Sequence, residues 1–538
     1  MTYATVPDVI ARAEQHSTRT AIVDCSGSYR YDRLLDASAR IAATLLNGQT
    51  DLPPQLTQKR RKSGTPDLRE QRVAFLVTPG FPWVATLWGI WRAGGIAVPL
   101  PLGTPWAELE YYVDDSQASA LICDVANEPH LEAARAKQNL RVLPCTEALA
   151  SEPVALPAIA NERRAMILYT SGTTSKPKGV VTTYTNIAAQ IASLVDAWEW
   201  SCGDRILLCL PLHHVHGIIN VVSCALWSGA VCEMLPRPPQ RAQNQRSSGA
   251  PGLDAEAVWQ RIASGQLTLF MAVPTIYVKL INAWENAPSE LRKSWSEGAA
   301  KLRLMVSGSA ALPVTTLERW REITGHTLLE RYGMTEIGMA ISNPYRGERV
   351  PGCVGRPLPG VAVRLVDEAA HEVQPCIPGE IEVMGASVFR EYWGKPDATR
   401  TAFRDGWFRT GDTAVIEDGV YRILGRSNVD ILKTGGHKVS ALEVEETLRE
   451  HPSIAECAVV GVPDPEWGER VAAAVVTRNS CILEIEELRS WAKERIAAHK
   501  VPSRLLLLEA LPRNAMGKVT KPAIRTLFEG VTSGTGKI

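Results

Sequence analysis

Short apolar runs, each closed by glycine, proline or a polar turn, recur along the chain and constrain its fold more than any other feature. They include RVAFLVTP, GGIAVPLP, MILYTSG, DRILLCLP and LRLMVSGSA, and helical patterns such as AAQIASLVDAWEW lie between several of them. Strand signals that alternate with helix signals are typical of parallel sheets covered by helices. We therefore predict an α/β fold of layered sheets and helices.

The length of 538 residues and a change of pattern after about residue 426 indicate more than one domain. The later part has the pattern helix, strand, turn and strand, followed by a further helix, a strand and a basic loop. We predict a large domain over 1–426, a hinge over 427–430 with Asp430 as the hinge residue, and a small, mobile α+β domain over 431–538.

Charge and cysteine content argue against several classes of protein. Lys+Arg and Asp+Glu both number 58, so a formal net charge of zero gives no electrostatic reason to expect nucleic acid or an anionic membrane as the main partner. No uninterrupted apolar run reaches about 18 residues, and the N-terminus lacks the apolar core of a secretory leader. The 11 cysteines form no CxxC pair, which is typical of a reducing compartment. We expect a cytoplasmic protein, a monomer or small homo-oligomer, that acts on small molecules.

The segment ILYTSGTTSKPKG (167–179) begins as a buried strand and ends in a loop of small, hydroxylic and basic residues. Backbone N–H groups and hydroxyls in such a loop can wrap a polyphosphate, and lysines neutralise its charge. A Walker loop is excluded, because Pro177 stands five residues after Gly172, where the Walker pattern has glycine. The loop by itself is equally compatible with an ordinary surface turn.

Five further motifs follow the loop in order: ERYGMTEIGM (330–339), DGWFRTGD (405–412), YRILGR (421–426), ILKTGGHKVSALEVE (431–445) and PRNAMGK (512–518). Together with the loop they resemble the adenylate-forming superfamily of acyl-CoA synthetases, peptide-synthetase adenylation domains and luciferases. The resemblance implies two reactions. A carboxylate attacks the α-phosphate of ATP to give an acyl-adenylate and pyrophosphate, and the thiol of CoA then displaces AMP.

The resemblance also implies a role for individual residues. Thr335 and Glu336 would be catalytic, with Thr335 on the α-phosphate and Glu336 binding Mg²⁺. Lys518 would be the catalytic lysine that the small domain brings to the site. The expected cofactor-binding residues are Thr170, Ser171, Gly172, Thr173, Thr174 and Lys178 for the phosphates of ATP, Tyr332, Asp412 and Arg426 for its nucleoside, and Gly435 and Gly436 for the pantetheine arm of CoA. Ser175 departs from the family, which usually has glycine there.

The acyl substrate is inferred from a closer resemblance, carried by LRLMVSGSAALP, LLERYGMTEIGMAISNPYRGERVPGCVGRPLPGV and VFREYW, to malonyl-CoA synthetases. That resemblance implies a small pocket with an arginine that holds the carboxylate of malonate that is not activated. Arg303 is the expected arginine, with Ser309 as a further substrate contact and His214 as a catalytic residue that orients the carboxylates. The residues alone leave open that Arg303 pairs with a structural carboxylate instead.

The expected function is therefore ATP-dependent conversion of malonate and CoA to malonyl-CoA, with methylmalonate tolerated. One alternative is a ligase for another small, aryl or fatty carboxylate. A second is a free-standing adenylation enzyme that loads a carrier protein. A non-catalytic nucleotide-binding protein is a third, disfavoured by the joint presence of Glu336, Asp412, Arg426 and Lys518.

Overall fold

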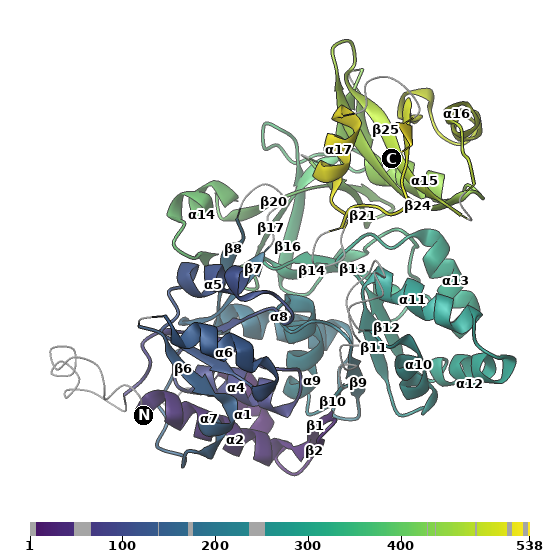
Figure 1. Cartoon of the computed structure of the whole chain (residues 1–538). Coiled ribbons are helices and arrows are strands. Elements are labelled where there is room, and N and C mark those ends of the chain that lie inside the picture. Colours follow the sequence, from purple (N-terminus) through teal and green to yellow (C-terminus); the bar gives the residue numbers. More distant parts are fainter. Residues whose placement is uncertain are drawn as a thin grey trace.

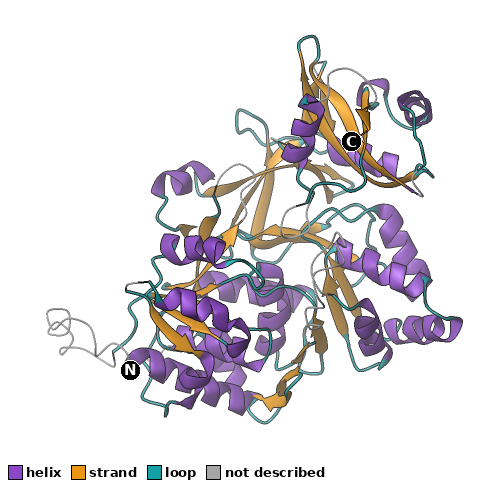
Figure 2. Cartoon of the chain, viewed as in Figure 1, coloured by secondary structure: helices purple, strands orange, loops and turns teal. Residues whose placement is uncertain are grey.

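The computed structural model describes residues 7–47, 66–137, 139–170, 176–235, 253–427, 429–435, 437–478, 481–513, 519–530 and 536–537. Within them the chain forms four β-sheets with helices packed around them (Figures 1 and 2). Three sheets build a large N-terminal domain, and the fourth builds a smaller C-terminal domain that lies at the top of Figure 1. The predicted fold class, layered α/β with a small C-terminal α+β domain, is confirmed.

The first sheet is a nine-stranded mixed sheet whose central strands are parallel. In spatial order its strands are β15 (Arg356–Pro357), β14 (Gly338–Ser342), β13 (Leu329–Met334), β12 (Leu304–Ser307), β11 (Leu269–Ala272), β9 (Arg205–Leu208), β10 (Val231–Met234), β1 (Thr20–Asp24) and β2 (Gly27–Arg30). The outer strands β14, β15 and β2 run antiparallel to their neighbours. Ligands of α/β sheets bind beyond the carboxyl ends of parallel strands, so a binding site is expected at the loops after β12 and β13.

The second sheet has seven strands, also parallel at its centre. Its order is β18 (Glu391–Tyr392), β8 (Lys178–Thr183), β7 (Arg164–Thr170), β4 (Ile96–Pro99), β3 (Arg72–Leu76), β5 (Ala120–Cys123) and β6 (Arg141–Pro144). Strands β7 and β8 pair antiparallel, so the glycine- and threonine-rich loop joins two strands of a hairpin. This hairpin agrees with the exclusion of a Walker loop, which joins a strand to a helix.

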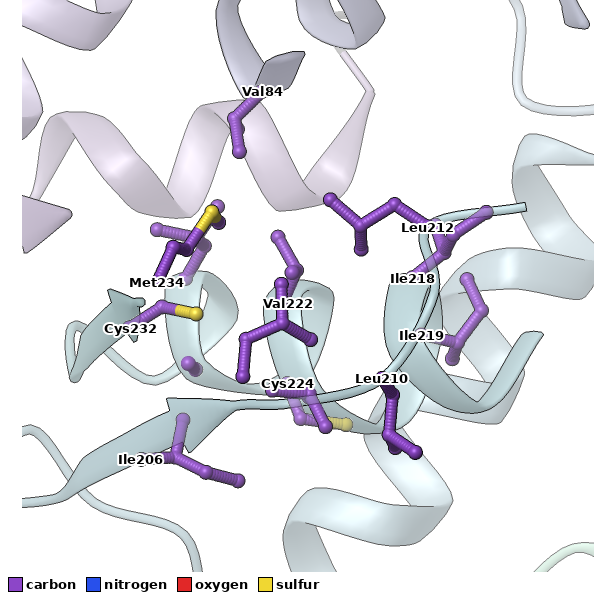
Figure 3. Packing of buried hydrophobic residues seen from close by; sticks show 14 of the residues in the cluster. Val84, Ile206, Leu210, Leu212, Ile218, Ile219, Val222, Cys224, Cys232 and Met234 are labelled. Atoms are coloured by element: carbon purple, nitrogen blue, oxygen red, sulfur yellow. The ribbon is translucent and has the colours of Figure 1, made fainter. Parts of the chain in front are cut away.

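Helices cover both of these sheets, and the largest apolar cluster is shared between them. They are α1 (Asp8–Glu14), α2 (Tyr31–Asn47), α4 (Phe81–Arg92), α5 (Trp106–Asp115), η2 (Val125–Asn127), α6 (Glu128–Arg135), α7 (Cys145–Ala150), α8 (Tyr184–Ala197), η3 (His216–Ser223), α9 (Cys224–Trp227), α10 (Ala255–Ala263), α11 (Pro274–Glu285), α12 (Ser289–Ala299) and α13 (Val314–Thr324). Figure 3 shows Val84 of α4, Val222 of η3 and Cys232 of β10 converging in this cluster. Helix η3 is a π-helix, a form that often accompanies functional sites.

The third sheet is a smaller antiparallel layer next to the second sheet. It consists of β16 (Val361–Val366), β17 (Gly379–Gly385), β20 (Trp407–Glu417), β19 (Phe403–Arg404) and β21 (Val420–Arg426), with helix α14 (Pro396–Ala402) beside it. Aromatic side chains fill the space between the second and third sheets, because Phe389, Tyr392 and Phe408 belong to one buried cluster with Val180. This layer brings Asp412 and Arg426 toward the carboxyl end of the first sheet.

The fourth sheet forms the small domain and shows the two-residue period of a sheet covered on both faces. Its strands are β23 (His437–Ser440), β22 (Ile431–Thr434), β25 (Gly468–Thr477), β26 (Arg504–Leu507), β27 (Gly536–Lys537) and β24 (Ile454–Asp464), with helices α15 (Ala441–Arg449), α16 (Ile485–Lys493), η5 (Ala498–Lys500) and α17 (Lys521–Glu529). On β25, Ala473 and Val475 face the cluster under α15 and α16, whereas Ala472 and Ala474 face the cluster under α17. The predicted order of helices and strands is confirmed.

Candidate active site

The phosphate loop is anchored by the paired ends of β7 and β8. Thr170 lies opposite Lys178 in the antiparallel ladder, and its Oγ1 donates a hydrogen bond to the carbonyl of Lys178 at 3.5 Å. The ammonium of Lys178 lies over the ring of Tyr392, 4.9 Å from its centre. Four expected phosphate ligands, Ser171, Gly172, Thr173 and Thr174, lie outside the described residues.

Glu336 lies in the turn between β13 and β14, directly after Thr335, and only 5% of its surface is exposed. Burial raises the pKa of this carboxyl group, while the hydroxyl of Tyr392, which donates to Oε1 at 3.0 Å, and the nearby Arg426 and Lys178 counteract the shift. Tyr392 is carried by β18, which pairs with β8, so the same edge of the sheet positions Glu336 and Lys178.

The described residues contain no group of three or more acidic, histidine or cysteine side chains that could enclose a metal ion. In phosphate-binding sites Mg²⁺ keeps several waters and takes one or two carboxylates together with the oxygens of the phosphates. Glu336 is a carboxylate of this kind, buried beside the hairpin that carries the phosphate loop. The residues present therefore fit a magnesium ion that arrives with a nucleotide.

Tyr332 and Asp412 come from different sheets and meet through a 2.6 Å hydrogen bond from the tyrosine hydroxyl to Oδ2 of the aspartate. The guanidinium of Arg426 lies 3.5 Å from the other oxygen, Oδ1, and pairs with it across the ladder of β20 and β21. Burial raises the pKa of Asp412, and the hydrogen bond from Tyr332 and the charge of Arg426 oppose this. The three side chains form a polar edge where a sugar with vicinal hydroxyls can donate to a carboxylate.

Arg303, the arginine expected to hold a carboxylate of the substrate, is paired with a carboxylate of the protein. Its Nε and Nη2 donate to the two oxygens of Asp204 at 2.7 and 2.8 Å, and Nη1 donates to the carbonyl of Trp198 at 2.9 Å. It also precedes β12, at the amino end of the strand, whereas ligands bind beyond the carboxyl ends. The bidentate pair supplies Arg303 with a counter-ion, as expected of a structural arginine.

Arg331, on the neighbouring strand β13, has the properties that were expected of Arg303. Only 3% of its surface is exposed, and the described residues provide no carboxylate that pairs with it. Among the described residues its one hydrogen bond is a 3.4 Å contact from Nη2 to the Oγ of Ser309, and its Nε finds no partner there. Burial lowers the pKa of Arg331 to about 9, so the side chain is still a cation at neutral pH. A buried cation without a counter-ion is costly, which indicates a site that awaits an anion.

Ser309 and His216 complete this cluster. Ser309 has a left-handed backbone with φ of 70°, a strained conformation for serine of the kind that gathers at functional sites. Its Oγ lies 3.3 Å from Nδ1 of His216, the first residue of helix η3. Burial, and then the charges of Arg331 and His214, lower the pKa of His216, so its ring is neutral at pH 7. Nε2 of His216 is buried, and the part of the chain that the structure describes gives it no partner, so it is available to a ligand.

Gly308 provides the space that Arg331 occupies. A Cβ atom at this position would lie 2.5 Å from the guanidinium carbon of Arg331, closer than atoms can pack. The loop after β12 therefore combines a glycine that admits the cation with a serine that contacts it.

Of the remaining expected residues, the structure describes His214 and Gly435. His214 lies beside His213, with ring centres 4.1 Å apart, and His216 rather than His214 contacts Ser309. Gly435, in the small domain, has φ of 53° and packs so closely on Trp467 that a Cβ atom would lie 2.8 Å from the indole ring. Gly436 and Lys518 lie outside the described residues.

Arg331 and His216 were not among the residues expected from the sequence, although Arg331 stands inside the motif ERYGMTEIGM and His216 lies two residues after His214. Arg331 belongs to ERYGMTE and lies in a strand, β13, whereas Arg303 precedes its strand. Strand direction was the missing signal, because Arg331 lies next to the loop that follows β12 and Arg303 lies at the opposite end of that strand.

Known proteins share both the sequence and the fold of this chain. The human mitochondrial malonate–CoA ligase ACSF3 is 44% identical over 96% of this chain and 91% of its own length. A malonate–CoA ligase of Arabidopsis thaliana is 39% identical over 96% of this chain and 88% of its own length. The ATP-bound crystal structure of MatB from Rhodopseudomonas palustris superimposes with a TM-score of 0.82 at 31% identity, covering 97% of this chain and 99% of that one.

Two family models also match, and they divide the chain in the order that the motifs predict. The model of the AMP-binding enzyme matches residues 68–393, and the model of the AMP-binding enzyme C-terminal domain matches residues 443–518. The matched ranges contain Arg331, Glu336 and Lys518, while Asp412 and Arg426 stand between them. The chain belongs to the AMP-binding enzyme family, the AMP-forming acid–thiol ligases that use ATP and CoA.

Proposed function

We propose that this protein is an ATP-dependent malonate–CoA ligase. In the first reaction a carboxylate of malonate attacks the α-phosphate of ATP, which gives malonyl-adenylate and pyrophosphate. In the second, the thiol of CoA attacks the acyl carbon and AMP leaves. The observation that carries the choice of malonate is the buried guanidinium of Arg331, which has no counter-ion among the described residues and lies beside Ser309 and His216.

Malonate fits this cluster because it brings a second negative charge. While one carboxylate reacts, the other can accept hydrogen bonds from the fork of Arg331 and from Ser309. Acetate would leave the guanidinium without an anion, at a cost of about 1–3 kcal/mol, roughly a 5- to 150-fold loss in kcat/KM. Methylmalonate keeps both carboxylates and is the expected second substrate. The names of the human and Arabidopsis relatives support malonate.

The other groups have roles that the family chemistry requires. Thr170, Lys178 and the loop between them hold the phosphates, Thr335 contacts the α-phosphate, and Glu336, oriented by Tyr392, takes the Mg²⁺. The ion neutralises charge on the phosphate oxygens when bound. The nucleoside lies against Tyr332, Asp412 and Arg426. Lys518 acts in the first reaction, and Gly435 and Gly436 let the pantetheine arm pass in the second. We propose that His214 orients the carboxylates, as the resemblance implies, and that His216 adds a second imidazole beside Ser309.

The domain limits expected from the sequence remain proposals: 1–426 for the large domain, 427–430 for the hinge and 431–538 for the small domain. Two sites on different domains are consistent with a hinge motion between the two reactions.

Cellular location and assembly are also predictions. Within the described part of the chain no helix is long and apolar enough to cross a membrane. We keep the cytoplasm as the proposed compartment, although the human relative is named mitochondrial, and fractionation of cells that express the protein decides between the two. The monomer or small homo-oligomer expected from the sequence is tested by light scattering.

The test compares substrates and two arginine variants. Pyrophosphate release and thioester mass are measured with malonate, methylmalonate, acetate and benzoate, in wild type, Arg331→Gln and Arg303→Gln. We expect malonyl-CoA from wild type, and a loss in Arg331→Gln that is at least tenfold larger for malonate than for acetate. Arg303→Gln should lose stability without a change in substrate preference.

Other outcomes point to the alternatives. A preference for benzoate or a fatty acid that Arg331→Gln does not alter would keep the ligase chemistry and contradict the malonate assignment. Thioester formation on an acyl carrier protein, with none on CoA, would favour the carrier-loading alternative. Binding of ATP without release of pyrophosphate would contradict enzymatic function altogether.

A further inference from the structure

Asp430 is held on both sides of the linker between the two domains. Toward the large domain, its Oδ2 accepts a hydrogen bond from the backbone N–H of Arg426 at 3.0 Å, and its own N–H donates to the carbonyl of Arg426 at 2.8 Å. Toward the small domain, its carbonyl accepts from the N–H of Ala441 at 2.7 Å. Gly425, with φ of 121°, makes this fold of the linker possible, because a Cβ atom there would lie 2.3 Å from the Cβ of Asp430.

Lys521 binds the remaining carboxylate oxygen of Asp430. The lysine is the first residue of helix α17, and its ammonium pairs with Oδ1 of Asp430 and, at 2.7 Å, with Oε1 of Glu445 on α15. The exposed fractions of the three side chains are 12%, 13% and 5%. Burial alone would lower the pKa of Lys521, but the two carboxylates raise it, so the lysine stays charged.

The ion pairs among Asp430, Lys521 and Glu445 are called the clamp below. Glu445 is itself held in place within the small domain. Its Oε1 also accepts the backbone N–H of Val459 at 2.9 Å, and its Oε2 pairs with Arg449 at 3.0 Å. A buried ammonium between two carboxylates is held firmly, because removal of one partner leaves an uncompensated buried charge. Asp430 is thus joined to the small domain by an ion pair and a backbone hydrogen bond, and to Arg426 by hydrogen bonds with two backbone groups.

Two further connections make this clamp relevant to the reaction. Lys521 stands three residues after Lys518 in the sequence. Arg426, which bonds Asp430 through its backbone, contacts Asp412 in the nucleotide site through its side chain. One contiguous set of contacts therefore joins the nucleotide site, the linker and the start of helix α17, which begins three residues after Lys518 in the sequence.

We propose that Lys521 is a positioning residue for the two-step reaction, which clamps Asp430 to the small domain and confines rotation to the chain before Asp430. Domain rotation then breaks the two hydrogen bonds between Asp430 and Arg426 and leaves the bonds to Lys521 and Ala441 in place. This proposal rests on the proposed function, since it assigns the clamp to the balance between adenylate formation and thioester formation. A purely structural ion pair would affect stability and leave that balance unchanged.

The experiment uses the full chain and variants of the clamp: Lys521→Met, Asp430→Asn and the conservative Lys521→Arg. Lys137→Met is the matched control, because Lys137 also holds two carboxylates, Glu110 at 2.7 Å and Asp114 at 2.8 Å, far from the linker. Adenylate formation is measured as malonate-dependent exchange of pyrophosphate into ATP, and thioester formation from malonyl-adenylate with CoA. Thermal unfolding is recorded for each variant.

We expect Lys521→Met and Asp430→Asn to change the ratio of the two rates at least tenfold in the same direction, with Lys521→Arg close to wild type. The double variant should be no worse than either single variant, since both remove one interaction. Equal loss of both rates, or a change in melting temperature alone, would overturn the proposal. Asp430→Asn, which retains the shape of the side chain, decides the matter if Lys521→Met does not fold.

A second measurement separates this proposal from the proposed function. Trypsin cleavage after Arg426 reports the freedom of the linker and needs no substrate. We expect faster cleavage in Lys521→Met than in wild type and Lys137→Met. If wild type shows no malonate-dependent exchange, the proposed function fails while the cleavage rates still test the clamp. Equal cleavage in all three proteins would contradict the clamp whatever the substrate is.

Discussion

Two arginines on neighbouring strands, Arg303 and Arg331, show how partner geometry separates a structural cation from a functional one. Arg303 donates three hydrogen bonds and has a bidentate carboxylate partner. Arg331 is more deeply buried, and within the described ranges it has a single long hydrogen bond, to Ser309. The first arrangement stabilises the folded chain. The second costs free energy until an anion binds.

Replacement of Arg303 by leucine should destabilise the protein by about 3–5 kcal/mol, because Asp204 would keep its charge in a buried position without its cation. Burial alone would raise the pKa of Asp204, but the hydrogen bonds from Arg303, the Ser201 amide and Thr268, and the charge of Arg303, lower it. A depressed carboxyl pKa contributes stability at neutral pH that is lost as the pH falls through the folded value. The difference between wild type and variant should therefore shrink below about pH 4.

Denaturant unfolding at several pH values measures this difference. The variant Arg319→Leu is the control, since Arg319 pairs with Glu285 and Glu322 on the surface and should cost less than about 1 kcal/mol. A gap between wild type and Arg303→Leu that stays constant down to pH 3 would contradict the assignment of the effect to Asp204.

Gly308→Ala should impair binding of the dicarboxylate while the fold is retained. The new methyl group would overlap the guanidinium of Arg331, which would have to move away from Ser309. We expect KM for malonate to rise at least tenfold, with a smaller change for acetate. Gly203→Ala is the control, because its nearest neighbour would be Ser201 Oγ at an ordinary distance of 3.6 Å. An unchanged KM for malonate in Gly308→Ala would place the carboxylate elsewhere.

Single residues could be predicted from the sequence where a motif alone locates them. Glu336 and Asp412 were selected from their motifs, and the structure describes both as buried carboxylates with hydroxyl donors. The contact between Tyr332 and Asp412 could not be predicted, because the two residues are 80 positions apart in the sequence and belong to different sheets. His216 could not be distinguished from His213 and His214 by spacing, since burial is what distinguishes it.

At the scale of elements, the order of strands and helices could be predicted from hydrophobic patterning. The exact ends of the strands could not, and they determine which polar side chains reach the site. A strand with alternating faces over LRLMVSGSA would place Arg303 and Met305 on the same face. In the structure the strand begins at Leu304 and all four of its residues are buried, so no alternation exists. A strand covered on both faces reads as a continuous apolar run, and its polar residues lie at its ends.

The N-terminus of helix α13, in the large domain, is capped by a side chain of the small domain. Its N-cap residue is Pro313, which offers no side-chain acceptor, and the N–H of Val314 donates instead to Oε1 of Glu446 on α15 at 2.7 Å. An acidic group at a helix N-terminus is favourable both as a hydrogen-bond acceptor and through the helix dipole. The small domain therefore stabilises a helix of the large domain in this arrangement.

Glu446→Ala should accordingly open the first turn of α13. The loss of a cap costs about 1 kcal/mol, so amide hydrogen exchange in this turn should accelerate roughly fivefold. Glu446→Gln retains the acceptor oxygen and is the matched control. Measurement is by mass spectrometry of the peptide that spans residues 311–320. Equal exchange in Glu446→Ala and wild type would mean that the two domains are rarely docked in this way in solution.

On the scale of the whole molecule, the site costs stability that the rest of the fold supplies. The carboxyl ends of β12 and β13 gather a buried cation, a strained serine and a histidine whose pKa is lowered first by burial and then by that cation. These features oppose folding, and they persist because the large apolar core holds the strands in place. Their cost is invisible in the sequence, since it depends on which groups the fold leaves without partners.

This balance predicts that Arg331→Met makes the empty protein more stable and removes its response to malonate. An apolar side chain of similar length fills the same space without a buried charge, so we expect a gain of about 1–4 kcal/mol and a higher melting temperature. Wild type should gain about 2.7 kcal/mol when malonate is present at 100 times its dissociation constant, whereas the variant should gain nothing. Thermal unfolding with malonate, with acetate and without ligand measures both effects. A less stable variant that still responds to malonate would show that Arg331 already has a counter-ion in the folded protein and that the dicarboxylate binds elsewhere.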